Sequence, residues 1–216
     1  LEAAFKGVDH LICFAVKANS NLAILNILAK NGAGFDIVSG GELKRVVAAK
    51  GDVEKIVFSG VGKTSEEIKM AIEKNILAFN VESEDELSRI QEIANSLNKK
   101  ASISIRVNPN VDAKTHPYIS TGLKENKFGV SEESAFDLYK KAKLLDSIEI
   151  EGIDCHIGSQ ITDLKPFEDS IKKLIKLVDR LEEEGINIRH IDIGGGIGIR
   201  YDDEKTIDFN EYAKII

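Results

Sequence analysis

The sequence contains no tryptophan, one methionine, two cysteines and three prolines among 216 residues. Cys13 and Cys155 belong to no CxxC pair, and a disulfide between them is the disfavoured alternative. We expect both thiols to be buried as small apolar side chains in a reducing cytosol. No apolar run approaches the length of a membrane span. The start, Leu1 to Ala4, has no signal-peptide pattern and no initiator methionine, as expected for a sequence that begins inside a longer chain.

Basic residues are fewer than acidic ones: the sequence has 29 Lys and Arg and 36 Asp and Glu, which gives a net charge of -7. Such a chain has no overall excess of cations to bind nucleic-acid phosphates. No serine lies in a GxSxG pattern, and the four histidines form no closely spaced ligand pair: His10, His116, His156 and His190. We therefore expect a cytoplasmic globular protein with no nucleic-acid partner, no membrane association and no bound metal.

What is present is an alternation of apolar runs with helical segments. Alternation of this kind predicts parallel strands joined by helical crossovers and buried on both faces. Helix starts are indicated by Thr64 with Glu67 and by Ser83 with Glu86, which have capping-box spacing, and Gly185 indicates a helix end. The seven apolar runs end near Val16, Val38, Phe58, Val81, Val107, His156 and Ile193.

Both a closed barrel and an open doubly wound sheet are compatible with this alternation. The short, even spacing of the first five runs and the polar residues that follow each strand favour a TIM-type (β/α)8 barrel, whose strand ends form one catalytic rim. Only seven strands are visible, so we expect residues 1–216 to form one incomplete barrel domain whose eighth strand lies beyond Ile216. The long gap between Asn108 and Val130 predicts a functional loop.

Lys17 closes the first apolar run in the string FAVKAN. Desolvation at the end of a buried strand disfavours an ammonium ion and leaves the amine available as a nucleophile toward carbonyl groups. The alternative is an ordinary lysine that extends from a strand end into solvent, and that interpretation is the more common one for a lysine in isolation.

Two further features follow later strands. One is a run of three glycines, Gly194 to Gly196, which would let the backbone approach an anion. The alternatives are a plain tight turn and a dinucleotide-binding fingerprint, both of which also use glycines. We disfavour the fingerprint because a glycine at its final spacing is missing. His156 follows the sixth strand, where it either stacks on a planar cofactor or is a structural histidine bonded to backbone.

Six strings together carry a family resemblance. They resemble the barrel domain of the diaminopimelate decarboxylase branch of the fold-type III pyridoxal-phosphate enzymes, a group of the alanine-racemase kind that also includes ornithine and arginine decarboxylases. The resemblance covers nearly the whole chain. In order, the strings are FAVKAN, FDIVSGGEL, RVNPNVDAKTHPYISTG, ENKFG, HIGSQITDL and HIDIGGGIG.

The resemblance implies roles for individual residues around pyridoxal 5'-phosphate. Lys17 would form the Schiff base with the cofactor, and His156 would stack on its ring and act with Lys17 in catalysis. Ser159 and the Gly194 to Gly196 turn would hold the phosphate. The remaining implied positions are Asp36, Glu42 and Arg106 on the rim, for which a structural ion-pair network is the alternative, and a substrate loop with His116, Tyr118, Ser120, Thr121 and Gly122.

The implied reaction is decarboxylation of meso-2,6-diaminopimelate to L-lysine in lysine biosynthesis. Alternatives are decarboxylation of arginine, ornithine or carboxynorspermidine, or a non-catalytic carrier of the cofactor. The family resembled is a homodimer with shared active sites. Its acidic residue on the eighth strand and its C-terminal β-domain have no counterpart in this sequence, so we expect these 216 residues alone to be inactive.

Overall fold

The structure is a computed structural model that describes residues 1–112, 128–202 and 206–216. The chain divides into two compact units, which are treated separately below. Unit 1 comprises Leu1–Asp9, Ile105–Lys140 and Gly152–Ile216, and unit 2 comprises His10–Ser104 and Lys141–Glu151. Two strands, β5 (Ala101–Asn108) and β7 (Ile148–Asp154), pass from one unit into the other.

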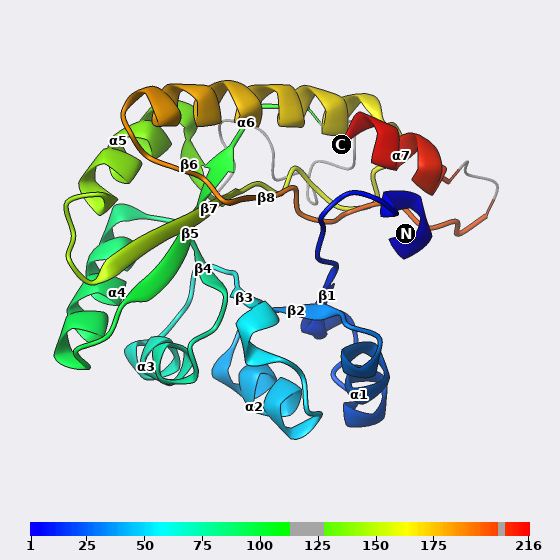
Figure 1. The fold of residues 1–216 in the computed structure, drawn as a ribbon. Coiled ribbons are helices and arrows are strands. Elements are labelled where there is room, and N and C mark those ends of the chain that lie inside the picture. The colour runs from blue at the N-terminus through cyan, green and yellow to red at the C-terminus, as the bar shows by residue number, and fades with distance from the viewer. Residues whose placement is uncertain (113–127, 203–205) are drawn as a thin grey trace. The chain divides into compact units, whose positions relative to one another are not determined.

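Unit 2 is built from parallel strands that alternate with helices (Figure 1). In the register of the strands, Ala15 is opposite Asp36, Asp36 opposite Val57 and Val57 opposite Ala78, so the carboxyl ends share one sheet edge. Besides parts of β5 and β7, the strands are β1 (Cys13–Ala15), β2 (Gly34–Ile37), β3 (Ile56–Phe58) and β4 (Ala78–Val81). The helical elements are η2 (Val16–Ala18), α1 (Leu22–Lys30), α2 (Gly40–Ala48), η3 (Val53–Lys55), α3 (Ser65–Lys74) and α4 (Glu84–Ser96).

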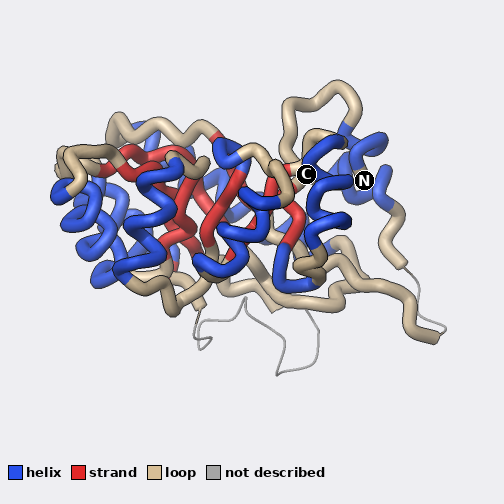
Figure 2. The backbone as a smooth tube through the Cα atoms, turned by 90° about the horizontal axis from the view of Figure 1, so that it is seen from below, coloured by secondary structure: helices blue, strands red, loops and turns tan. Residues whose placement is uncertain are grey.

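Helices α1 to α4 pack against one another in chain order alongside these strands (Figures 1 and 2). The strands β3 and β4 are buried at every position, as the near-continuous apolar runs predicted. By contrast, β1 is only half-buried throughout, and Cys13 within it is half-buried. The expectation that both cysteines are buried is therefore wrong for Cys13 and confirmed for Cys155.

Unit 1 holds the carboxyl ends of β5 and β7 together with the short strands β6 and β8. The short strand β6 pairs with β5, and β8 pairs with β7 with Asp154 opposite Asp192. A cluster of buried side chains lies among the loops and helices after β7, namely Ile157, Ile161, Phe167, Ile207 and Tyr212. The elements are η1 (Glu2–Phe5), β6 (Val130–Ser131), most of α5 (Glu132–Ala142), α6 (Lys165–Glu183), β8 (His190–Asp192) and α7 (Phe209–Ile215).

The strand order decides between the two predicted topologies. Neighbours follow chain order as β1-β2-β3-β4-β5-β7-β8, with β6 paired to β5 outside this path. A doubly wound sheet reverses its order at a switch point, whereas a barrel adds each strand beside the last. The barrel-type topology is therefore confirmed, and the seven predicted strands are found with ends within about two residues of their expected positions. The two-residue β6 was predicted as loop, because so short a strand carries no periodic pattern.

The predicted helix ends are also confirmed, with one variation. Thr64 and Glu67 form a complete capping box at the start of α3. At α4, the Ser83 hydroxyl accepts the Glu86 N–H at 3.2 Å, but the Glu86 carboxylate accepts the N–H of Glu82 at 2.9 Å instead of the serine N–H. Gly185 follows α6 with a φ of 67°, the left-handed conformation typical of a helix terminator.

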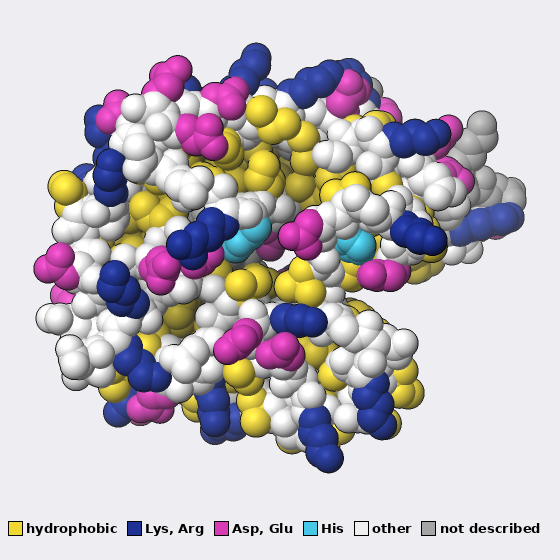
Figure 3. Space-filling view, viewed as in Figure 1, with side chains coloured by type: hydrophobic (Ala, Val, Ile, Leu, Met, Phe, Trp, Pro, Cys, Tyr) yellow, Lys and Arg dark blue, Asp and Glu magenta, His cyan; other side chains and the backbone are white. Residues whose placement is uncertain are grey.

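On the face shown in Figure 3, basic and acidic side chains are interspersed over the helices. Within residues 1–112, 128–202 and 206–216, no helix combines the length and apolar character needed to cross a bilayer. The same residues contain no cluster of three or more His, Cys, Asp or Glu side chains that could hold a metal ion.

Candidate functional site

Lys17 lies in η2, the turn that directly follows β1 in unit 2. The turn is closed by the Asn19 N–H, which donates to the Val16 carbonyl at 3.1 Å, and it buries Val16 completely. The Lys17 side chain is exposed. The expectation of a desolvated amine at a strand end is therefore wrong, because the chain leaves the strand before Lys17. The structure instead leaves this amine accessible to a ligand.

Glu42, predicted on the rim, completes the N-terminal cap of α2. Its carboxylate accepts the N–H of Val38 at 2.7 Å, while its own N–H donates to the Ser39 hydroxyl at 3.2 Å. The neighbouring Gly40 N–H donates to Glu67 of the next helix at 2.8 Å. Through these bonds Glu42 stabilises the start of α2. Asp36 lies one residue before the end of β2 and is half-buried.

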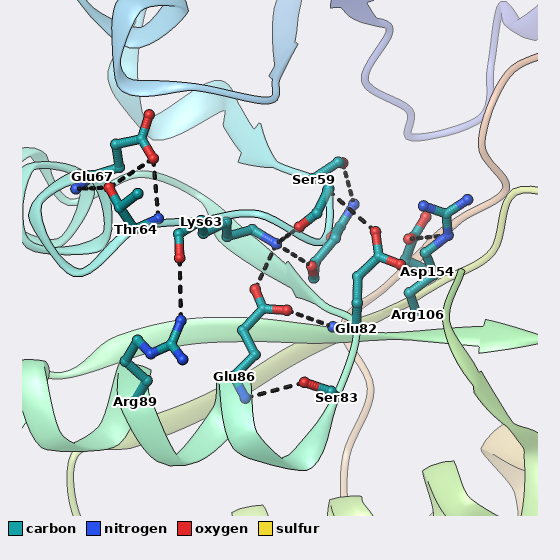
Figure 4. Close-up of polar contacts among 12 residues, drawn as sticks. Ser59, Lys63, Thr64, Glu67, Glu82, Ser83, Glu86, Arg89, Arg106 and Asp154 are labelled. Atoms are coloured by element: carbon teal, nitrogen blue, oxygen red, sulfur yellow. Dashed lines mark hydrogen bonds and ion pairs between the residues drawn. The ribbon is translucent and has the colours of Figure 1, made fainter. Parts of the chain in front are cut away.

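A buried ion pair that the sequence analysis missed lies at the same sheet edge of unit 2 (Figure 4). Lys63 Nζ is 2.6 Å from Glu86 Oε1, and the two side chains are 1% and 8% exposed. The ammonium also donates to the carbonyls of Gly60 at 2.6 Å and Asn80 at 2.8 Å, so its three protons are all used. The pair therefore ties the loop after β3 to β4 and α4. Glu86 was recognised only as a capping residue, and no pattern in sequence indicates that Lys63 is buried.

The glycine turn of unit 1 begins at Gly194, the second residue after β8. Gly194 and Gly196 have φ values of 70° and 90°, and a Cβ atom at Gly194 would lie 2.4 Å from the Cys155 carbonyl oxygen. A Cβ at Gly195 would meet no atom within 4 Å, so the middle of the turn faces open space. Glycines are thus required at the first and last positions because the backbone lies too close for a side chain.

His156 lies next to this turn. Its Nδ1 accepts the Gly195 N–H at 3.3 Å, so the proton of the neutral ring is placed on Nε2. The Gly194 N–H donates to the Asp192 carboxylate at 2.8 Å. Ser159 is exposed three residues further along, and its Cα would be 3.3 Å from a Cβ at Gly196. The structure therefore brings together His156, Ser159 and the three glycines.

Arg106 is buried at the carboxyl half of β5, also in unit 1. Its Nε lies 3.9 Å from Asp154 Oδ2, and its guanidinium lies over the Phe128 ring at 5.1 Å from the ring centre. The side chains of the ion pair are 10% and 6% exposed. The ion-pair alternative considered for Arg106 is thus observed, and Asp154 is a partner that the sequence analysis did not identify.

Cys155 lies between these groups but is not suited to nucleophilic chemistry. Burial, together with the nearby carboxylates of Asp154 and Asp192, raises the pKa of its thiol well above the usual value. The thiol is therefore neutral at physiological pH, and a neutral thiol is a poor nucleophile. This agrees with the structural role predicted for this cysteine.

A cavity of about 280 Å³ opens at the opposite edge of the sheet in unit 2, at the amino ends of β4 and β5. Glu54, Asn75, Lys100 and Glu151 are among its lining residues. In barrels, that edge contributes to stability and the carboxyl edge carries catalysis. The predicted substrate-loop residues His116, Tyr118, Ser120, Thr121 and Gly122 lie outside the described residues.

Comparison with known proteins gives concordant matches. A sequence model of the family described as "Pyridoxal-dependent decarboxylase, pyridoxal binding domain" matches residues 1–216. A diaminopimelate decarboxylase of Pseudomonas aeruginosa is 58% identical over 99% of this chain and 51% of its own length. One of Pseudomonas fluorescens is 59% identical over 99% of this chain and 51% of its own length.

The fold has a similar counterpart among solved structures. Diaminopimelate decarboxylase from Helicobacter pylori, complexed with L-lysine, matches with a TM-score of 0.97 and 51% identity. The match covers 99% of this chain and 54% of that one. The chain thus spans about half the length of the curated relatives it matches.

Proposed function

The chain belongs to the pyridoxal-dependent decarboxylases, and from this membership we propose that the complete protein converts meso-2,6-diaminopimelate to L-lysine and carbon dioxide. The observation that carries the proposal is the identity of 58% and 59% to diaminopimelate decarboxylases over nearly the whole chain. The L-lysine in the similar Helicobacter pylori structure is the product of this reaction and supports the choice of substrate.

The family implies pyridoxal 5'-phosphate as the cofactor, and the residues of unit 1 fit its phosphate arm. The turn at Gly194 to Gly196 leaves open space at its middle residue, and Ser159 is exposed beside its last residue. His156 is oriented by the Gly195 N–H and presents a flat ring next to the same turn. An exposed serine hydroxyl, glycine backbone that leaves space for an anion and an oriented ring beside them suit an aromatic ring that carries a phosphate on a methylene arm.

We assign the chain's own groups as follows. The exposed Nζ of Lys17 would hold the cofactor through its aldehyde and, once released, would carry a proton to or from the reacting carbon. His156 would support one face of the ring, and Ser159 with the glycine turn would hold the phosphate. Asp36 and Arg106 would contribute charge around the site, Arg106 while paired with Asp154. When bound, the cofactor accepts the electron pair released as the carboxylate leaves.

This assignment requires Lys17 and the glycine turn to open onto one cavity, which stays a prediction.

We further propose that the complete protein is a cytoplasmic homodimer whose subunits share active sites. Sedimentation of the complete protein, together with restored activity on mixing two differently inactivated variants, would support this assembly. Activity in a strictly monomeric preparation would contradict it.

The decisive assay measures carbon dioxide release by the complete protein with diaminopimelate, arginine, ornithine and carboxynorspermidine in parallel. Diaminopimelate should react at least about tenfold faster, by kcat/KM, than the others. Faster release from another amino acid would identify that alternative, and cofactor binding without any release would indicate a carrier.

Lys17→Ala tests the covalent attachment directly. The variant should lose the absorbance band of lysine-bound cofactor and at least about 100-fold in turnover, because general acid–base catalysis at Nζ is lost too. Lys30→Ala removes another exposed lysine of the same unit, at the end of α1, and should leave both unchanged. An intact band in Lys17→Ala would refute the assignment.

A further inference from the structure

The structure points to a positioning role for Gln160, an assignment that rests on the proposed function. We propose that its amide group clamps the backbone of Ile199 and thereby holds Ser159 and the Gly194 to Gly196 turn in the arrangement that receives the phosphate of the cofactor. All of these residues lie in unit 1. Gln160 itself touches neither ring nor phosphate in this assignment.

The backbone conformation of Gln160 is unusual for its residue type. Its φ of 57° lies in the left-handed region, which side chains other than those of Asn and Asp adopt infrequently. Among the described residues, the other non-glycine cases are Lys50, Asn75, Asn98 and Asn110, three of them asparagines. A glutamine in this conformation needs surrounding contacts to hold it there.

The amide of Gln160 supplies such contacts. Its Nε2 donates to the Ile199 carbonyl at 2.5 Å, and its Oε1 accepts the Ile199 N–H at 3.1 Å. The side chain thus pairs with both polar groups of one residue, as a neighbouring strand would. Because the nitrogen and the oxygen of its amide both bond to Ile199, Gln160 can hold the backbone of that residue in place.

This clamp extends a ladder that joins the two loops of the proposed phosphate site. The Ile161 N–H donates to the Gly196 carbonyl at 2.8 Å, and the Gly198 N–H donates to the Ile161 carbonyl at 2.8 Å. Before the turn, the Cys155 N–H donates to the Asp192 carbonyl at 2.9 Å. Residues 193–195 are therefore anchored on both sides.

The bend at Gln160 decides where Ser159 lies. A Cβ atom at Gly196 would be 1.9 Å from the Gly158 carbonyl oxygen, which shows how closely the two loops approach. Because Ser159 stands between Gly158 and the bend, a change in the φ of Gln160 would move its hydroxyl relative to the turn. We infer that Gln160 controls affinity for the phosphate and has little effect on affinity for the ring.

The test compares pyridoxal phosphate with unphosphorylated pyridoxal as ligands of the complete apoprotein. Gln160→Glu keeps the size of the side chain but replaces the donor to the Ile199 carbonyl with a carboxylate oxygen. Its dissociation constant for pyridoxal phosphate should rise about tenfold, the upper size expected for the loss of one hydrogen bond, while that for pyridoxal changes less than about twofold. A purely structural defect would weaken both ligands equally, and that result would overturn the proposal.

Two further variants guard against misfolding and strain. Gln160→Gly adopts the left-handed conformation freely but has no amide, so it should also weaken pyridoxal phosphate selectively; wild-type affinity for both ligands would overturn the clamp. Gln91→Glu makes the same chemical change at the chain's other glutamine, on α4, and should leave the ratio of the two dissociation constants unaltered. Failure of the unmutated protein to bind pyridoxal phosphate would instead refute the proposed function itself.

Discussion

The buried ion pair of Lys63 and Glu86 makes the sharpest stability prediction. Lys63→Met keeps most of the apolar stem and removes the ammonium. The Glu86 carboxylate, only 8% exposed, then loses its cationic partner. The carbonyls of Gly60 and Asn80 also lose a hydrogen-bond donor. The free energy of unfolding should therefore fall substantially in this variant.

The magnitude follows from what each group loses. Removing one partner of a buried ion pair costs about 3–5 kcal/mol, because the remaining charge is left in a poorly solvated place. Glu86 keeps the Glu82 N–H at 2.9 Å, which offsets part of that cost and favours the lower end, about 3 kcal/mol. Lys63→Met combined with Glu86→Gln leaves no charge at either position of the pair and retains an oxygen for that N–H. The double variant should recover about 1–2 kcal/mol relative to Lys63→Met alone.

Urea unfolding of the complete protein, followed by far-ultraviolet circular dichroism, measures these differences. Lys69→Met serves as the control, since Lys69 is an exposed lysine of α3 and its replacement should change stability by less than about 0.5 kcal/mol. If Lys63→Met is no less stable than Lys69→Met, or if the double variant is less stable than Lys63→Met, the reasoning about an uncompensated charge is wrong.

Two other predictions concern hydrogen bonds to backbone. Tyr139→Phe removes a fully buried hydroxyl that donates to the Gly152 carbonyl at 2.7 Å and accepts the Ile105 N–H at 3.2 Å. Thermal unfolding should show that the free energy of unfolding falls by about 2–4 kcal/mol. A fall below about 1 kcal/mol would contradict this prediction. Hydrogen bonds, chiefly from the Gly40 N–H, lower the pKa of Glu67 in the folded protein. The ionised carboxylate therefore contributes its full stabilisation of the fold above the ordinary pKa of 4.5. That contribution is lost as the pH falls through the lowered pKa. The difference in melting temperature between Glu67→Gln and the parent should therefore shrink on acidification, and a constant difference would refute it.

Local patterns sufficed for the elements of the fold. Seven apolar runs became seven strands, and Thr64, Ser83 and Gly185 mark helix ends as expected. These features depend on residues close in sequence, since a strand needs a run of apolar residues and a cap needs a carboxylate three positions away. The same logic placed His156 and the glycine turn on one rim of strand ends, because polar residues after parallel strands meet at one sheet edge.

The missed and mistaken features all depend on distant residues. Lys17 and Cys13 are less buried than their apolar neighbours suggested, because β1 is only half-buried. Lys63 is more buried than a lysine in a loop would suggest, because Glu86, 23 residues later, and two carbonyls surround its ammonium. Burial is a property of the packed chain, so it cannot be read from a residue type.

The sequence by itself determined the order of strands and helices, the family to which the chain belongs, and the residue types available to bind a phosphate and attack an aldehyde. Tertiary structure decided which of those residues meet: His156 with Gly195, Arg106 with Asp154, and Gln160 with Ile199. The physical reason is range. Propensity and capping act over a few residues, whereas hydrogen-bond partners and burial are set by segments that approach only when the chain has folded.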